Sequence, residues 1–231
     1  MRLVGTESVD GTGNELNNVL WGNDNSNTLT GDLGDDVLNG RGGADCMQGE
    51  ADNDLYLVDN IVDQVMEKAN QGEQDTVLAS VSYALSENVE NLKLDGNGNL
   101  NATGNDQNNL IVGNGGNNRI RGFAGSNILH GDNGDDTVEG RNGLDRLYGE
   151  GGNDLLRGFE ASDTLDGGTG NDQMEGGSGN DTFVVDDDGD QVVEEFGPDT
   201  GTLDQVLSSI SYTLEDNVEK LQLIGNEADL L

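Results

Sequence analysis

The sequence has few of the residues that most catalytic and metal sites need. Its 231 residues include one cysteine, Cys46, and one histidine, His130. An internal disulfide and a thiolate metal cluster are therefore excluded, and zinc lacks a set of His and Cys ligands. A Ser-His-Asp triad could use only His130, which is expected to lie on the surface. We therefore expect no catalytic site in this chain, and any catalytic domain would lie outside it.

Basic and apolar residues are also scarce. Ten Lys and Arg stand against 46 Asp and Glu, the net charge is −36, and only 32% of the residues are hydrophobic. Such a polyanion is not expected to bind nucleic acid or to insert into a membrane, and no apolar run has the length of a membrane span. Residues 1–20 lack the layout of a cleavable secretory signal. This composition predicts disorder unless bound cations neutralise the carboxylates.

Glycine, in contrast, is abundant and recurs every nine residues in two blocks, residues 13–57 and 104–184. When each of these glycines is counted as position 1, position 6 is always Asn or Asp. Position 8 is always apolar or aromatic in the second block. The most regular copies are GGTGNDQME (167–175) and GGSGNDTFV (176–184). A fixed short period of this kind is the signature of a solenoid.

A longer repeat surrounds these blocks. Residues 3–22 match 94–113, residues 54–68 match 181–195, and residues 77–94 match 206–223. We therefore divide the chain into a partial strand-rich unit (1–12), a first repeat block (13–57), a strand-rich segment that continues or caps it (58–103), a second block (104–184) and a second, truncated strand-rich segment (185–231). Because the chain starts and stops inside the longer repeat, we expect it to be a fragment of a longer array.

The nonapeptide predicts an all-β fold, a parallel β-roll or β-helix solenoid. A short strand with one inward side chain at position 8 cannot be stable alone, so each glycine-rich turn should lead to another short strand in a second sheet. Two nonapeptides then make one coil of about 18 residues, and successive coils stack in parallel sheets. Glycines at positions 1, 2 and 4 allow backbone angles that other residues avoid, and they keep the carbonyls of the turn unobstructed.

The position-6 aspartates would recur along each edge of the solenoid once per coil. Neighbouring carboxylates there repel by about 4 kcal/mol per pair at ~4 Å and an effective dielectric near 20, unless a cation lies between them. Carboxylate and carbonyl oxygens are the ligands that Ca²⁺ prefers. The predicted pairs are Asp36/Asp54, Asp45/Asp63, Asp136/Asp154, Asp154/Asp172, Asp172/Asp190, Asp145/Asp163 and Asp163/Asp181. They predict about five to seven calcium ions.

The pattern G-G-x-G-x-D-x-U-x in residues 167–184 resembles the RTX (repeats-in-toxin, haemolysin-type) calcium-binding family. The resemblance implies a calcium-bound β-roll module of a larger secreted bacterial protein, exported by type I secretion and folded by extracellular calcium. It does not fix an activity, because members of this family include toxins, proteases, lipases, adhesins and alginate epimerases. A monomer is expected.

Some copies depart from this pattern. Ala161 replaces a position-4 glycine, and the turns before Asp63 and Asp190 lack the glycines of positions 1, 2 and 4, which predicts weaker sites there. Coils with Asn at position 6 can be held by amide hydrogen bonds and are expected to bind little or no calcium. The position-6 asparagines are Asn18, Asn27, Asn109, Asn118 and Asn127.

Two alternative functions remain open, a spacer in an adhesin and an accessory module that binds an acidic, alginate-like polysaccharide. Positions 7 and 9 face away from the predicted core, so basic and aromatic residues there could contact a glycan. Arg119, Arg121 and Arg157 share one face, and Arg146 and Tyr148 share the other with His130. The simpler interpretation is that these arginines offset nearby carboxylates.

Overall fold

The computed structural model describes residues 1–3, 5, 7–69, 71–194 and 203–225. Over these residues the chain forms strands and no helix, so it contains no helix long and apolar enough to span a membrane. The strands lie in parallel sheets wound into a β-solenoid, which confirms the predicted fold. Part of the predicted second strand-rich segment, residues 195–202 and 226–231, lies outside the described residues.

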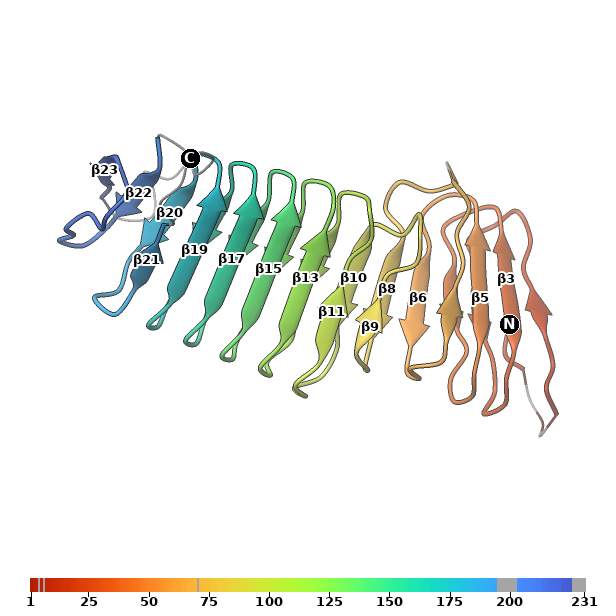
Figure 1. Ribbon diagram of the computed structural model, residues 1–231. Coiled ribbons are helices and arrows are strands. Elements are labelled where there is room, and N and C mark those ends of the chain that lie inside the picture. The colour runs from red at the N-terminus through yellow and green to blue at the C-terminus, as the bar shows by residue number, and fades with distance from the viewer. Residues whose placement is uncertain (4, 6, 70, 195–202, 226–231) are drawn as a thin grey trace. The chain divides into compact units, whose positions relative to one another are not determined.

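The chain divides into two compact units. Unit 1 comprises Met1–Gly96 and Asn101–Leu110, and unit 2 comprises Asn97–Leu100 and Ile111–Leu231. The boundary falls within β12 (Leu110–Val112). Figure 1 shows the strands of each unit.

Unit 1 contains strands of two to five residues whose pairing is parallel. One sheet has the order β2-β4-β6-β8-β10, a second has the order β1-β3-β5-β7, and β9 pairs with β11. The strands are β1 (Gly11–Thr12), β2 (Val19–Trp21), β3 (Thr28–Asp32), β4 (Val37–Asn39), β5 (Cys46–Glu50), β6 (Leu55–Val58), β7 (Gln64–Val65), β8 (Thr76–Ala79), β9 (Tyr83–Ala84), β10 (Asn91–Leu94) and β11 (Asn101–Thr103). The sheets therefore extend through the strands of residues 58–103.

Unit 2 has the same construction. One sheet contains β14-β16-β18-β20-β22-β23 and the other β13-β15-β17-β19-β21, and Figure 1 shows β13, β15, β17 and β19 side by side. The strands are β13 (Arg119–Phe123), β14 (Ile128–His130), β15 (Thr137–Asn142), β16 (Arg146–Tyr148), β17 (Leu155–Glu160), β18 (Thr164–Asp166), β19 (Gln173–Ser178), β20 (Thr182–Val185), β21 (Gln191–Val193), β22 (Gln205–Ser208) and β23 (Lys220–Leu223).

The register of the strands follows the predicted coil of two nonapeptides. In unit 2, Ile120 pairs with Val138, which pairs with Leu156, and Leu156 pairs with Met174. These position-8 side chains are completely buried, whereas the positions on either side are mostly half-buried or exposed. Each coil thus contributes two inward side chains to a narrow core, which is why a chain so poor in apolar residues can form one.

The turn glycines have two different roles. Position 4 has positive φ in the turns that begin with a position-1 glycine and carry a position-6 aspartate, as at Gly134 (φ 124) and Gly152 (φ 142), and so does position 2, as at Asp32 (φ 90). Position 1 does not have positive φ. A Cβ atom at Gly131 would instead lie less than 3.0 Å from the Asp136 side chain and from the Gly149 carbonyl. The expectation that position 1 needs glycine for its backbone angle was wrong, because it needs glycine for space.

Ala161 keeps the left-handed conformation of the glycine that it replaces, with φ 79. A non-glycine residue in this conformation is strained by about 1–2 kcal/mol, and glycine would relieve this strain. Glycine also makes the unfolded chain more flexible, which offsets roughly 0.5 kcal/mol of the relief. We expect Ala161→Gly to raise the free energy of unfolding by about 1 kcal/mol, measured with urea at saturating calcium. Ala124→Gly, at a site without positive φ, is the control and should be destabilising. Equal effects of the two substitutions would contradict the assignment of strain.

Candidate metal sites along the turns

The position-6 aspartates form two continuous rows in each unit, which we call the aspartate ladder. Each carboxylate accepts a hydrogen bond, through Oδ1, from the backbone N–H of the position-6 residue one coil earlier. The N–H of Asp145, for example, donates to Asp163, and that of Asp163 donates to Asp181. The donor–acceptor distances in nine such bonds lie between 2.6 and 2.8 Å. One oxygen of each ladder aspartate therefore holds adjacent coils together.

The second oxygen of these carboxylates, Oδ2, is buried and has no hydrogen-bond partner. The nine side chains are only 1–3% exposed. An unpaired charged oxygen in such a place is strongly unfavourable. The residues are Asp36, Asp45, Asp54, Asp136, Asp145, Asp154, Asp163, Asp172 and Asp181.

The position-1 glycine places a second acceptor beside this oxygen. The point where a Cβ atom of Gly158 would stand lies less than 3.0 Å from both Asp163 Oδ2 and the carbonyl oxygen of Gly176. Gly131 and Gly149 have equivalent surroundings. Neither oxygen can donate a hydrogen bond to the other, so a hard cation between them would satisfy both. The residues present therefore fit calcium.

The electrostatic cost of the ladder is visible in its pKa values. Burial, with further contributions from Asp145 and Asp181, raises the pKa of Asp163 to about 8. Burial also raises the pKa of Asp136 and of Asp172 to about 7, and that of Asp45 to about 6. Without a cation the ladder thus disfavours its own ionised form near neutral pH.

Asp63 and Asp190 differ from the other ladder residues. Asp63 Oδ2 accepts the N–H of Asn60 at 3.1 Å, and Asp190 Oδ2 accepts the N–H groups of Asp186 and Asp187 at 3.2 and 3.1 Å. These two side chains already have partners for both oxygens. The weaker sites that the sequence predicts for them stay a prediction.

Turns with Asn at both position 2 and position 6 are closed by their own hydrogen bonds. In the turn that begins at Gly113, Asn118 Oδ1 accepts the N–H of Asn114, and Asn114 Oδ1 accepts the N–H of Gly116. The Asn118 amide donates to the Leu100 carbonyl at 3.0 Å. The turns that begin at Gly13, Gly22 and Gly104 contain the same pair of internal bonds. In the aspartate turns the second position-6 oxygen faces a carbonyl and has no hydrogen bond. In these asparagine turns the position-6 oxygen accepts a hydrogen bond from within the turn.

The ladder extends beyond the residues that the sequence predicted. Asp75 Oδ1 accepts the N–H of Asp54, and Asp204 Oδ1 accepts that of Asp181, both at 2.8 Å. The connections span 21 and 23 residues, which a search at the coil period does not find. The signal was the triplet of Asp, a polar residue and Val that begins DTVL (75–78) and DQVL (204–207), as in the repeats.

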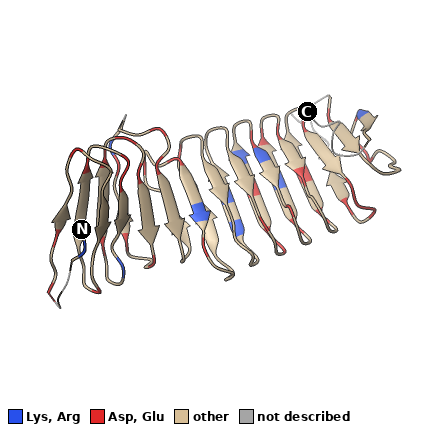
Figure 2. Ribbon diagram, turned by 180° about the vertical axis from the view of Figure 1, so that it is seen from behind, with Lys and Arg blue, Asp and Glu red and all other residues tan. Residues whose placement is uncertain are grey.

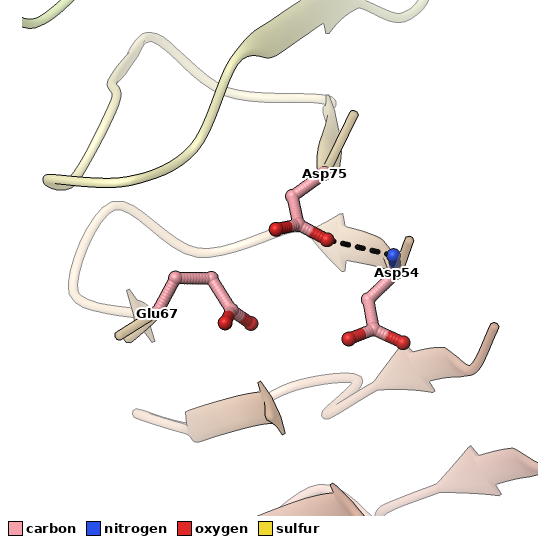
Figure 3. A group of neighbouring side chains, drawn as sticks. All are labelled: Asp54, Glu67 and Asp75. Carbon is pink, nitrogen blue, oxygen red and sulfur yellow. Dashed lines mark hydrogen bonds between the residues drawn. The ribbon is translucent and has the colours of Figure 1, made fainter. Parts of the chain in front are cut away.

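Two glutamates join these residues. Asp54, Glu67 and Asp75 each offer a carboxylate oxygen within 4.8 Å of the other two, and so do Asp181, Glu194 and Asp204. Figure 3 shows the first of these groups, with the Asp54 N–H bonded to Asp75. Neither glutamate is among the site residues that the sequence predicted.

The arginines of the predicted glycan face form ion pairs. Arg119 and Arg121 both contact Glu139, which is only 2% exposed, and Arg157 contacts Glu175 at 2.6 Å. Burial acts to raise the pKa of Glu139, but hydrogen bonding to Arg121 and the charges of Arg119 and Arg121 lower it overall. Figure 2 shows several basic segments on strands, and acidic segments at many turns. The charges of these three arginines are thus largely neutralised by glutamates of the same sheet.

The opposite outer face carries a stacked aromatic pair. The rings of His130 and Tyr148 are 4.7 Å apart and nearly parallel, and His130 Nδ1 lies 2.7 Å from Glu150 Oε1. Arg146 lies on the same strand as Tyr148 and is exposed. Glycan binding by either face stays a prediction.

A family model described as the RTX calcium-binding nonapeptide repeat matches residues 12–45, 21–56, 103–138, 130–158 and 157–192, together more than half of the chain. No curated protein matches the sequence. The matched segments contain the ladder residues from Asn18 to Asp54 and from Asn109 to Asp190.

Proposed function

Because this chain belongs to the RTX calcium-binding nonapeptide repeat family, we propose that its solenoid forms when calcium ions bind along the aspartate ladder. The repeat solenoid is a structural calcium-binding module and not a catalytic one. The observation that carries the proposal is the set of nine buried Oδ2 atoms without hydrogen-bond partners. A calcium ion bound in an aspartate turn, as beside Gly158, would pair this oxygen with the carbonyl of the next coil.

The ligands in this proposal are the ladder aspartates that the sequence singled out, together with position-1 carbonyls. About five to seven ions would be bound, with Asp63 and Asp190 contributing to the weakest sites because their second oxygens accept backbone hydrogen bonds. The asparagine turns would bind none. Calcium would neutralise the buried carboxylates, and the coiled backbone would place them in rows.

We further propose that the module acts outside the cell, as part of a larger protein exported by type I secretion, and that it is monomeric. A chain whose carboxylates oppose folding would stay extended in the low-calcium cytosol and would fold after export. Family membership and the acidic composition support this proposal. Any catalytic domain would lie outside this chain.

Binding of an acidic polysaccharide is the alternative function. The exposed Arg146 and the stacked His130 and Tyr148 favour it. Glycan binding by the other face is disfavoured by the ion pairs of Arg119, Arg121 and Arg157. A glycan would have to displace buried or half-buried glutamates from these arginines. A spacer role in an adhesin would need the same calcium-bound solenoid and no ligand.

Counting the bound ions tests the proposal. Equilibrium dialysis should find about five to seven Ca²⁺ per chain and far fewer Mg²⁺, because Mg²⁺ demands a stricter octahedral geometry. Asp36→Ala should lower the calcium count. Asn18→Ala, the adjacent position-6 residue of the same row, should leave the count unchanged. Equal binding of the two metals, or loss of an ion from Asn18→Ala, would refute the assignment of ligands.

A further inference from the structure

We propose that the two carboxylate triads, Asp54–Glu67–Asp75 and Asp181–Glu194–Asp204, are each a single calcium site that binds more tightly than the sites within the ladder. Each would close the end of one repeat block. This inference rests on the proposed function, because it assumes that the ladder itself binds calcium.

The first triad is assembled from three successive segments of unit 1. Asp54 precedes β6, Glu67 follows β7, and Asp75 precedes β8, and Figure 3 shows their carboxylates gathered in one place. Glu67 stands one coil after Gly49, where the next position-1 glycine would be expected, and its Oε1 accepts the Gly49 N–H at 3.1 Å. A carboxylate side chain thus occupies the place of the missing turn.

The burial of Asp54 indicates that this cluster needs a ligand. Asp54 is 2% exposed and its Oδ2 has no hydrogen-bond partner. The same oxygen faces the space beside Gly49, where a Cβ atom would lie less than 3.0 Å from it. Glu67 Oε2 is likewise buried without a partner. Two unpartnered carboxylate oxygens in one enclosed cluster call for a cation and not for further hydrogen bonds.

The second triad repeats this arrangement in unit 2. Asp181 is 1% exposed with an unpartnered Oδ2, and Glu194 is 8% exposed. A Cβ atom at Gly176 would lie less than 3.0 Å from both Glu194 Oε1 and Asp181 Oδ2. Glu194 also stands one coil after Gly176, its position-1 glycine. An acidic cluster without a role would not be expected to recur with the same three contributing segments.

The geometry and charge of the triads suit calcium. Two oxygens on one Ca²⁺, each ~2.3–2.6 Å from the ion, can be at most about 5 Å apart, and the oxygens of each triad lie within 4.8 Å of one another. A site within the ladder offers one buried carboxylate oxygen and a carbonyl oxygen, whereas a triad offers three carboxylates. Calcium affinity rises with the number of charged ligands, so the triads should bind first.

The surroundings of the two triads differ at the position of Tyr56. In the first, the Tyr56 hydroxyl donates a hydrogen bond to Glu67 Oε1 and accepts the Gly49 N–H at 2.8 Å. The equivalent residue in the second triad is Phe183, which has no hydroxyl. The hydroxyl competes with a cation for one Glu67 oxygen. We therefore expect the second site to bind calcium more tightly than the first.

Calorimetric calcium titration of the full chain tests the inference. The wild type should show two ions bound tighter than the rest. Glu67→Gln should weaken one of them, and Glu194→Gln the other, by about tenfold or more. The control is Glu160→Gln, which removes an exposed charge outside both triads and should leave both tight sites unchanged.

A second variant covers the case in which the glutamine variants fail to fold at saturating calcium. Tyr56→Phe should tighten the first site about threefold or more and leave the second unchanged. The proposal of tight triad sites would be overturned by a wild type that binds calcium with one uniform affinity, or by glutamine variants that bind as the wild type does. Calcium binding by the ladder would not be affected by either result. A wild type that binds no calcium would instead overturn the proposed function.

Discussion

In excess chelator the chain should lose its β structure, and added calcium should restore it with a midpoint of about 10⁻⁴ to 10⁻³ M. The reason lies in the ladder. Nine buried aspartate oxygens of the ladder have no hydrogen-bond partner, and the narrow core of position-8 side chains must offset this cost in a chain with a net charge of −36. We do not expect so small an apolar core to hold such a row of charges without cations.

Circular dichroism during a calcium titration is the measurement, with the fluorescence of Trp21, the single tryptophan, reporting on unit 1. Two controls separate coordination from charge screening. Magnesium at the same concentration should fold the chain poorly, and sodium chloride at the same ionic strength should not fold it, because salt screens exposed charges but does not coordinate buried ones. A well-ordered β spectrum in excess chelator would contradict the prediction.

Asp163→Ala should raise the calcium concentration needed for folding about tenfold, which corresponds to ~1.4 kcal/mol. Asp163 lies between Asp145 and Asp181 in its row, accepting from the first and donating to the second. Its Oδ2 faces the Gly176 carbonyl beside Gly158. The substitution removes a cation ligand and also leaves the N–H of Asp145 without its acceptor, so neighbouring sites should weaken with it.

Asp45→Ala is the matched comparison and should shift the midpoint less than about twofold. Asp45 has Asn27 on one side and Asp63 on the other, and the second oxygen of Asp63 already accepts a backbone hydrogen bond. Both substitutions remove one negative charge, so repulsion alone predicts equally easier folding for both. Asp163→Asn keeps an acceptor for Asp145 and should lie between alanine and wild type. Equal midpoints for the two alanine variants would exclude calcium binding along the ladder as the cause of folding.

The periodic part of the molecule was predictable from its sequence because it depends on local rules. The glycine period predicts a coil of two nonapeptides, and the inward position 8 follows from the alternation of side chains along a strand. Val138 and Leu156, which are one coil apart, pair as that period requires. The ladder aspartates were predictable for the same reason, since one register places all of them along the edges.

The ends of the blocks were not predictable, because there the period changes. Asp75 and Asp204 follow their partners after 21 and 23 residues, so counting in whole coils misses them. Glu67 and Glu194 stand where a turn glycine is expected, and in the sequence they resemble ordinary surface glutamates. Only the fold shows that their carboxylates lie beside those of the ladder.

The asparagine turns illustrate a different limit. The sequence indicated that Asn at position 6 weakens calcium binding, but it did not reveal the function of Asn114 at position 2, whose side chain closes the turn by bonding the N–H of Gly116. That bond depends on a turn conformation without the positive φ at position 2 that Asp32 and Arg141 adopt. Two turn geometries thus exist within one nonapeptide pattern, and the pairing of Asn residues distinguishes them.

The constant register of unit 2 also limits how such a gene can change in length. Thr137 pairs with Leu155, which pairs with Gln173, so every coil is interchangeable with the next along both edges. Deleting or duplicating the codons of two adjacent nonapeptides would remove or add a complete coil and leave every other pairing intact. A change of a single nonapeptide would move all later strands to the opposite sheet and would join different rows of aspartates. Arrays of this kind should therefore grow and shrink by recombination in steps of two nonapeptides.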